Sequence, residues 1–207
     1  MRMLRNARVV WLCRAGLMAG TMVLAASIQA EGLIASGDFE NEGEGTLPAE
    51  WLIEGATAEE AQVVLESGPS GGEKVLLLAG REGVNSSIST AKIPIDPSKP
   101  LVISGWMKGS GELNAAGGYV MLTFFDEGGA ALGRDINSPE RTTRNLCIYS
   151  GEEWKEFQRE FLPESQFSQS ASGQLPLPAN AAYFELKMAT LGYPGKLWFD
   201  GLSARQD

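Results

Sequence analysis

The sequence contains no histidine, and this absence excludes several kinds of chemistry. Histidine is the commonest general base in proteins and supplies the nitrogen ligand of most zinc sites. Serine and cysteine nucleophiles that depend on a histidine base are excluded with it. Two carboxylates can still hydrolyse a glycosidic bond, but the acidic pairs Glu59-Glu60 and Glu152-Glu153 lie next to turns, where solvated acids are expected. The sequence therefore predicts a protein that is not an enzyme, with a small glycan hydrolase or lyase as the alternative.

Cysteine is scarce, with Cys13 and Cys147 as the two in the chain. Only Cys147 remains if the first 30 residues are removed, so no disulfide can form within the remaining chain. Cys147 lies in the apolar triplet Leu146-Cys147-Ile148. We therefore expect a buried and unreactive thiol.

No apolar run is long enough for a stable transmembrane helix. The best candidate, residues 15–26, has 12 residues, whereas a helix needs roughly 20 to cross the hydrocarbon core. It follows a positively charged stretch and precedes small Ala30, which is the order of a secretory signal peptide. We expect residues 1–30 to be a cleaved signal, residues 31–207 to form one domain, and the protein to be secreted or periplasmic. An uncleaved N-terminal anchor is the alternative.

Basic residues are outnumbered, with 17 Lys and Arg against 26 Asp and Glu, for a formal charge of −9. Four arginines and no acids lie in residues 1–30, so cleavage would leave 13 basic and 26 acidic residues, a charge of −13. Such a charge repels phosphate backbones and anionic lipids. Nucleic acid is therefore not an expected partner, whereas calcium or a neutral ligand is compatible with this charge.

Turn residues are abundant, with 25 Gly and 10 Pro. They separate short runs rich in Val, Ile, Leu and aromatic residues that partly alternate with polar ones, a pattern typical of strands. No window of 12 or more residues shows a helical stripe. This pattern predicts an all-β fold, a two-sheet antiparallel β-sandwich of jelly-roll type. The expected strands are 33–39, 51–53, 62–66, 74–79, 86–95, 101–108, 119–126, 131–136, 154–162, 182–189 and 196–204.

Six segments carry landmarks in a fixed order. They are LIASGDFE at 33–40 with Pro48 and Trp51, GGEKVLLL at 71–78, LVISGWMK at 101–108, FFDEGG at 124–129, WKEF at 154–157 with Pro163, and GKLWFDGLS at 195–203. In this order they resemble the galactose-binding-like β-sandwich of many cellulase- and xylanase-associated carbohydrate-binding modules. The chain departs from that family at Gly201, where a second acid usually follows the first.

The resemblance implies noncatalytic carbohydrate binding and a structural calcium ion. Its side-chain ligands would be Glu40 and Asp200, with Asp38 as a further candidate, because calcium prefers carboxylate and carbonyl oxygens. The alternative is that these acids only decorate strand ends.

The segment 101–108 suggests where a sugar would bind. Alternation places Val102, Ser104, Trp106 and Lys108 on one face of a strand, and an aromatic ring among polar groups suits a sugar ring and its hydroxyls. Tyr119 and Phe125 are expected on the neighbouring strand. The predicted ligand-binding residues are Trp106, Ser104, Lys108, Tyr119 and Phe125. Alternatively, Trp106 covers the core beneath a loop.

Together these features predict an exported, noncatalytic module that binds a polysaccharide or oligosaccharide. The competing hypothesis is an exported protein-interaction or envelope-assembly module that has lost the sugar site. Its partner would then be another exported protein.

Overall fold

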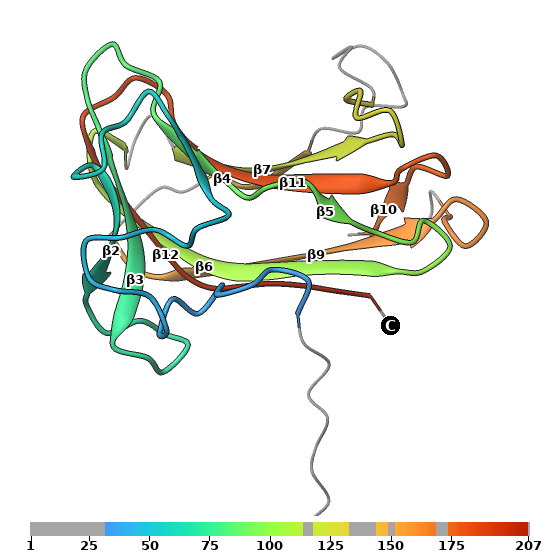
Figure 1. Cartoon of the computed structure of the whole chain (residues 1–207), viewed down its shortest axis with the longest axis horizontal. Coiled ribbons are helices and arrows are strands. Elements are labelled where there is room, and N and C mark those ends of the chain that lie inside the picture. Colours follow the sequence, from blue (N-terminus) through green and yellow to red (C-terminus); the bar gives the residue numbers. More distant parts are fainter. Residues whose placement is uncertain (1–31, 114–117, 133–143, 149–151, 169–173, 207) are drawn as a thin grey trace, which may run out of the picture.

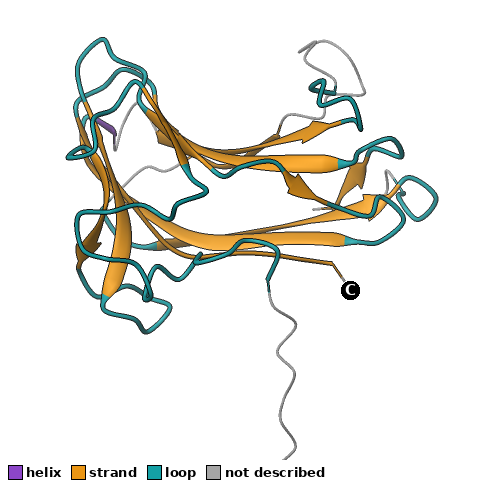
Figure 2. Cartoon of the chain, in the orientation of Figure 1, coloured by secondary structure: helices purple, strands orange, loops and turns teal. Residues whose placement is uncertain are grey.

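The computed structural model describes residues 32–113, 118–132, 144–148, 152–168 and 174–206. The predicted signal peptide and most of the predicted strand 131–136 lie outside these residues. Apart from a helical turn at Leu113, the regular elements of the described chain are strands (Figures 1 and 2). None of the described residues belongs to a helix that could span a bilayer.

The strands form two sheets packed face to face, as the layers in Figure 1 show. Sheet A has the order β1-β4-β11-β7-β8, with β5 paired to β11, and its described pairs are all antiparallel. Its strands are β1 (Leu52–Glu54), β4 (Ser87–Ser89), β5 (Ile93–Pro94), β7 (Gly118–Phe125), β8 (Arg144–Ile148) and β11 (Tyr183–Thr190).

Sheet B has the order β10-β9-β6-β12-β3-β2. Its pairs are antiparallel except for β10 and β9, which run parallel. The predicted all-β sandwich is confirmed, with this one parallel pair as the exception to a fully antiparallel arrangement. The strands of sheet B are β2 (Ala61–Leu65), β3 (Lys74–Gly80), β6 (Leu101–Gly111), β9 (Lys155–Pro163), β10 (Gln174–Leu177) and β12 (Gly195–Gln206).

The core lies between the two sheets and follows from alternation along the strands. On β6, for example, Leu101, Ile103 and Met107 are fully buried, whereas Val102, Ser104 and Trp106 are half-buried. Phe124 of sheet A meets Phe161 of sheet B edge to face, with 5.3 Å between ring centroids. Burial of these inward side chains is the main favourable term that holds the layers together. Cys147 is also buried, as predicted, and burial raises the pKa of its thiol.

The predicted strand 33–39 is wrong. This segment forms turns that run along the outside of β12, where Leu33 N donates to Ala204 O and Leu202 N donates to Gly37 O. Ser36 and Phe39 have φ values of 53° and 60°, which no strand accommodates. Phe39 is nevertheless fully buried, and its ring packs against Trp51 with 5.7 Å between centroids. The segment is therefore a strap along the edge of β12, in which Ile34 and Phe39 are buried and Ala35 and Asp38 are exposed.

Candidate functional site

The outer face of sheet A carries a band of half-buried aromatic and polar side chains. Tyr183 of β11 lies opposite Phe125 of β7 in the strand register, and Tyr119 lies six residues before Phe125 on β7. Six residues of strand span about 20 Å at roughly 3.3 Å each, so the band is long enough for an oligosaccharide. In Figure 1, loops extend above the layer of β7 and β11 at both ends of this face. The other side chains on this face, which we call the outer face of sheet A, are Leu52, Glu54, Ser87, Ser89, Met121, Thr123, Glu185 and Lys187.

Hydrogen-bonding groups lie between the aromatic ends of the band. Register places Glu185 opposite Thr123, and Lys187 between Ser89 and Met121. The hydroxyls of Ser87 and Ser89 are almost buried, and neither has a hydrogen-bond partner within the described residues. A buried hydroxyl without a partner costs free energy unless water or a ligand satisfies it. The face therefore offers both ring surfaces and free hydrogen-bonding capacity.

The charges on this face are largely neutralised by their neighbours. Lys187 Nζ lies 2.9 Å from Glu54 Oε2, and this hydrogen bond lowers the pKa of Glu54. Lys92 Nζ lies 4.2 Å from the centroid of the Phe125 ring and donates to Gly129 O at 2.8 Å. Burial raises the pKa of Glu185, although Lys187 and Lys92 act in the opposite direction. A neutral ligand suits this face better than an anion.

We expect Glu185→Gln to stabilise the protein at neutral pH. Because burial raises the folded-state pKa of Glu185 above its ordinary value, the ionised carboxylate costs stability above that pKa. The advantage of glutamine should shrink as the pH falls through the folded-state pKa, where wild-type Glu185 becomes neutral, and vanish below the ordinary value. Melting temperatures of both proteins between pH 4 and 8 measure this difference. A difference that grows toward low pH would contradict the argument.

The outer face of sheet B carries the other predicted ligand-binding residues. Ser104, Trp106 and Lys108 alternate along β6 and are half-buried. Lys108 Nζ lies 4.9 Å from the ring centroid of Trp154 and 4.8 Å from that of Trp198, and it forms an ion pair with Glu66. Lys108 is thus already held by cation–π contacts and an ion pair.

The five predicted ligand-binding residues therefore do not form one site. Ser104, Trp106 and Lys108 lie on sheet B, whereas Tyr119 and Phe125 lie on sheet A, and the outer faces of the two sheets point in opposite directions. The expectation that the 119–126 strand neighbours the 101–108 strand is wrong, because the chain crosses from one sheet to the other after β6. Alternation predicts which side chains share a face of a strand, but it does not predict which strands are neighbours.

The acids predicted to bind calcium anchor the loop between β2 and β3. Asp200 is fully buried, and its carboxylate accepts hydrogen bonds from Ser70 N at 2.8 Å and Ser70 Oγ at 2.7 Å. Glu40 Oε1 accepts from Lys74 N at 2.9 Å. A Cβ at Gly68 would overlap the Asp200 carboxylate and a Cβ at Gly72 would overlap that of Glu40, so a larger residue at either position would displace the carboxylate that holds the loop. The structure thus brings Glu40 and Asp200 to opposite ends of one loop.

Asp38 is not part of that arrangement. It is exposed, its Oδ1 accepts a 3.4 Å hydrogen bond from Glu40 N, and it borders a separate surface depression with Asn41 and Ser203. Lys74 Nζ donates to the carbonyl oxygens of Glu40 and Glu42, both at 2.8 Å. Among the described residues, no three Asp, Glu, Cys or His side chains are placed to hold a metal ion together.

Comparison with known proteins identifies the fold. No family model matches the chain, and no curated protein matches its sequence. The structure of TmCBM61 in complex with β-1,4-galactotriose matches with a TM-score of 0.54 and 14% identity, over 86% of this chain and 100% of that one. The CBM22-1 xylan-binding domain of Paenibacillus barcinonensis Xyn10C matches with a TM-score of 0.52 and 12% identity, over 85% of this chain and 94% of that one. The chain has the β-sandwich fold of carbohydrate-binding modules, as the six sequence landmarks predicted.

The same fold occurs as part of larger proteins. The enzymatically active domain of bacteriophage CBA120 tailspike protein 4 matches with a TM-score of 0.57 and 13% identity, over 85% of this chain. The match covers 21% of the tailspike chain, so this protein spans about a fifth of the tailspike length.

Proposed function

We propose that the protein binds a carbohydrate without transforming it and does so through the outer face of sheet A. The observation that carries this proposal is the arrangement of Phe125 and Tyr183 at one end, Tyr119 at the other, and hydrogen-bonding side chains between them. Aromatic rings contact the apolar faces of sugars, whereas serine, threonine and glutamate side chains bond to sugar hydroxyls. The fold supports the proposal, because TmCBM61, which shares it, forms a complex with β-1,4-galactotriose, and the CBM22-1 module that also shares it is a xylan-binding domain.

Affinity measurements on neutral glycans test the proposal. Isothermal titration calorimetry with cello-, xylo-, manno- and galacto-hexaoses, together with pull-down on the corresponding polysaccharides, should detect binding at millimolar or lower concentration. Absence of binding to every glycan in this set would contradict the proposal.

A catalytic role has weaker support than noncatalytic carbohydrate binding. Glu54 and Glu185 are the acids on the outer face of sheet A in the described chain, and Glu54 is paired with Lys187. A glycosidase needs one acid to donate a proton and another to act as base or nucleophile, and a carboxylate held in an ion pair is a poor proton donor. We therefore expect no new reducing ends and no unsaturated products when the protein is incubated with the glycans that it binds.

A protein-interaction role remains the second candidate because of exposed apolar side chains on edge strands. Leu52 on β1 is 61% exposed and Leu65 on β2 is 60% exposed. β1 and β2 end their sheets, and edge strands can pair with strands of a partner. Pull-down from the envelope of the producing cell with wild type and with a Leu65→Lys variant distinguishes the two roles, because Leu65 lies on sheet B, away from the proposed sugar-binding face.

Export is part of the proposal, and the charge arrangement of residues 1–30 supports it. Mass spectrometry of the protein from the periplasm and the medium should give an N-terminus close to residue 31. A full-length chain that stays in the cytoplasm would contradict this part of the proposal.

The calcium site stays a prediction that melting temperatures can check. Calcium bound near Glu40 would compete with the Lys74 ammonium for the carbonyl oxygens of Glu40 and Glu42. Calcium should therefore raise the melting temperature relative to EDTA, and it should do so by a larger amount in Lys74→Met than in wild type. No calcium-dependent shift in either protein would show that Glu40 and Asp200 serve only to anchor the loop.

A further inference from the structure

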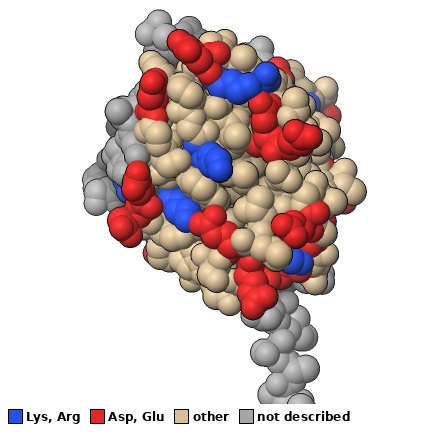
Figure 3. Space-filling view, turned by 90° about the vertical axis from the view of Figure 1, so that its left-hand side faces the viewer, with Lys and Arg blue, Asp and Glu red and all other residues tan. Residues whose placement is uncertain are grey.

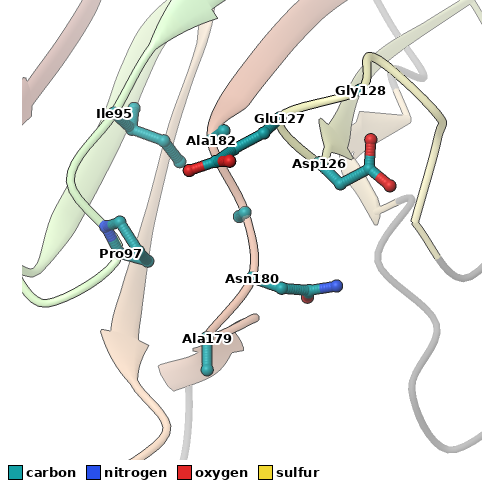
Figure 4. Close-up of a pocket in the computed structure, with 9 residues that line it drawn as sticks. Ile95, Pro97, Asp126, Glu127, Gly128, Ala179, Asn180 and Ala182 are labelled. Carbon is teal, nitrogen blue, oxygen red and sulfur yellow. The ribbon is translucent and has the colours of Figure 1, made fainter.

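A pocket of about 410 Å³ lies at the end of the sandwich, next to the Phe125–Tyr183 pair. Its volume falls within the range of about 300–1,000 Å³ that small-molecule sites occupy. Figure 4 shows the side chains that line it. They come from the segment after β5, the turn after β7 and the turn before β11, and are Ile95, Pro97, Asp126, Glu127, Gly128, Ala179, Asn180, Ala181 and Ala182.

Backbone hydrogen bonds tie the walls of this pocket to the end of the outer face of sheet A. Ala182 N donates to Phe125 O at 2.8 Å, and Ile95 N donates to Ala182 O at 3.0 Å. Asp126 and Ala182 directly adjoin Phe125 and Tyr183 in the chain. The pocket therefore adjoins the Phe125–Tyr183 end of the outer face of sheet A.

The walls combine an apolar side with polar groups. Ile95 and Pro97 supply apolar surface. The Glu127 side chain reaches toward Ile95 from the turn after β7, whereas the Asn180 side chain extends in the opposite direction from the turn before β11 (Figure 4). Neither the Glu127 carboxylate nor the Asn180 amide has a hydrogen-bond partner within the described residues. A carboxylate accepts hydrogen bonds, and an amide both donates and accepts them, so each of the two can bind a sugar hydroxyl. The apolar side would cover the C–H face of the same ring.

The turn that carries the acids is rigidly held. Asp126 Oδ1 accepts from Ala130 N at 2.8 Å, and Gly129 N donates to Asp126 O at 2.9 Å. Glu127 is therefore presented from a fixed backbone, which lowers the entropy cost of binding.

The charge of the pocket restricts the class of ligand. Asp126 and Glu127 line it, and none of its lining residues is basic. The ammonium group of Lys92, which lies over the Phe125 ring, already donates a hydrogen bond to Gly129 O. Sugar carboxylates and sulfates would be repelled here, because the two acids carry charge of the same sign.

We propose that this pocket binds the terminal residue of a neutral glycan whose following residues lie on the outer face of sheet A. The inference rests on the proposed function, because it places in the pocket one end of the same glycan that binds to the outer face of sheet A. It predicts that the protein recognises chain ends in addition to internal segments.

Paired measurements on a hexasaccharide and its polymer test the inference. The ligands are the neutral hexaose that binds best in calorimetry and the matching long polysaccharide, in which ends are rare. The double variant Glu127→Gln, Asn180→Ala should bind the hexaose at least tenfold more weakly and bind the polymer with nearly unchanged affinity per site. Glu164→Gln removes an exposed acid in a turn that does not line the pocket and serves as the charge control. Borohydride reduction of the hexaose then shows whether the reducing end is the one bound.

Each result has a distinct meaning. Unchanged hexaose affinity in the double variant, with loss of affinity in Tyr183→Leu, would overturn the pocket and leave the proposed function intact. Equal weakening for hexaose and polymer would also overturn end recognition, and hexagalacturonate binding as tightly as the neutral hexaose would overturn the ligand class. If neither wild type nor any variant binds a glycan, the proposed function fails and this inference fails with it.

Discussion

Replacement of both Phe125 and Tyr183 by leucine should remove most of the carbohydrate affinity of the protein. The two residues are register partners on β7 and β11 and form the aromatic end of the outer face of sheet A. Aromatic anchors at binding sites typically contribute about 1–2 kcal/mol each. Their joint loss then corresponds to a decrease in affinity of roughly 30-fold to several hundred-fold. Calorimetry with the best-binding neutral hexaose measures this decrease.

Leucine is chosen so that the strands keep their apolar surface while the rings are lost. Both side chains are half-buried, and the cation–π contact of Lys92 with Phe125 is worth about 0.5–1 kcal/mol at an exposed site. The variant should therefore stay folded, which circular dichroism and a melting curve can verify. Loss of binding in an unfolded variant would say nothing about the site, so Phe125→Tyr, which keeps the ring, is the second control and should bind nearly as wild type.

Trp106→Leu is the matched variant on the opposite sheet. Trp106 lies on the outer face of sheet B beside Gly201 and Ser70. If the sugar binds on sheet A, this variant should keep its affinity. Loss of affinity in folded Trp106→Leu, with full affinity in the sheet A variant, would assign the site to sheet B and contradict our proposal.

A second large effect is expected from Gly37→Ala, which should destabilise the fold by about 3 kcal/mol, the upper end for overpacking a close contact. A Cβ at residue 37 would overlap the carbonyl oxygen of Leu202 and lie 2.9 Å from its carbonyl carbon. The same two residues are joined by a 2.8 Å hydrogen bond from Leu202 N to Gly37 O. The strap would have to move away from β12, which would partly expose the buried Phe39 and Ile34.

Urea unfolding of wild type, Gly37→Ala and Gly43→Ala measures this effect. Gly43 lies in the same region, but a Cβ there would make ordinary contacts at 3.4 and 3.5 Å with Thr46. Gly43→Ala should therefore change the free energy of unfolding by less than about 0.5 kcal/mol, as is usual for a tolerated surface change. Equal stability of the two alanine variants would show that the strap does not contribute to the global fold.

The sequence predicted the β-sandwich well because its strands have a strong local signal. Alternation along β6 predicted both the strand and its inward face, since a side chain on a strand can point to only two faces. The prediction of a strand at 33–39 rests on the apolar residues Leu33, Ile34, Ala35 and Phe39. Nothing in that pattern indicates the positive φ values of Ser36 and Phe39.

The departure at Gly201 has a structural reason that the sequence could not supply. Gly201 lies in a bulge where the pairing of β12 with β6 shifts between Asp200 and Ser203, and its φ is +55°. A side chain is strained in that conformation, and a Cβ there would lie 3.1 Å from Ser70 Cβ. The bulge leaves Asp200 buried beneath the loop that Ser70 anchors.

By itself, the sequence determined the fold class, the inward face of β6, the buried thiol and the acidic charge, because each depends on composition or on neighbours in the chain. The tertiary structure alone decided that Phe125 lies beside Tyr183 and that Trp106 lies on the other sheet. Pairing between strands distant in sequence depends on how the two layers pack and where the chain crosses between them, and periodicity within one strand carries no information about either.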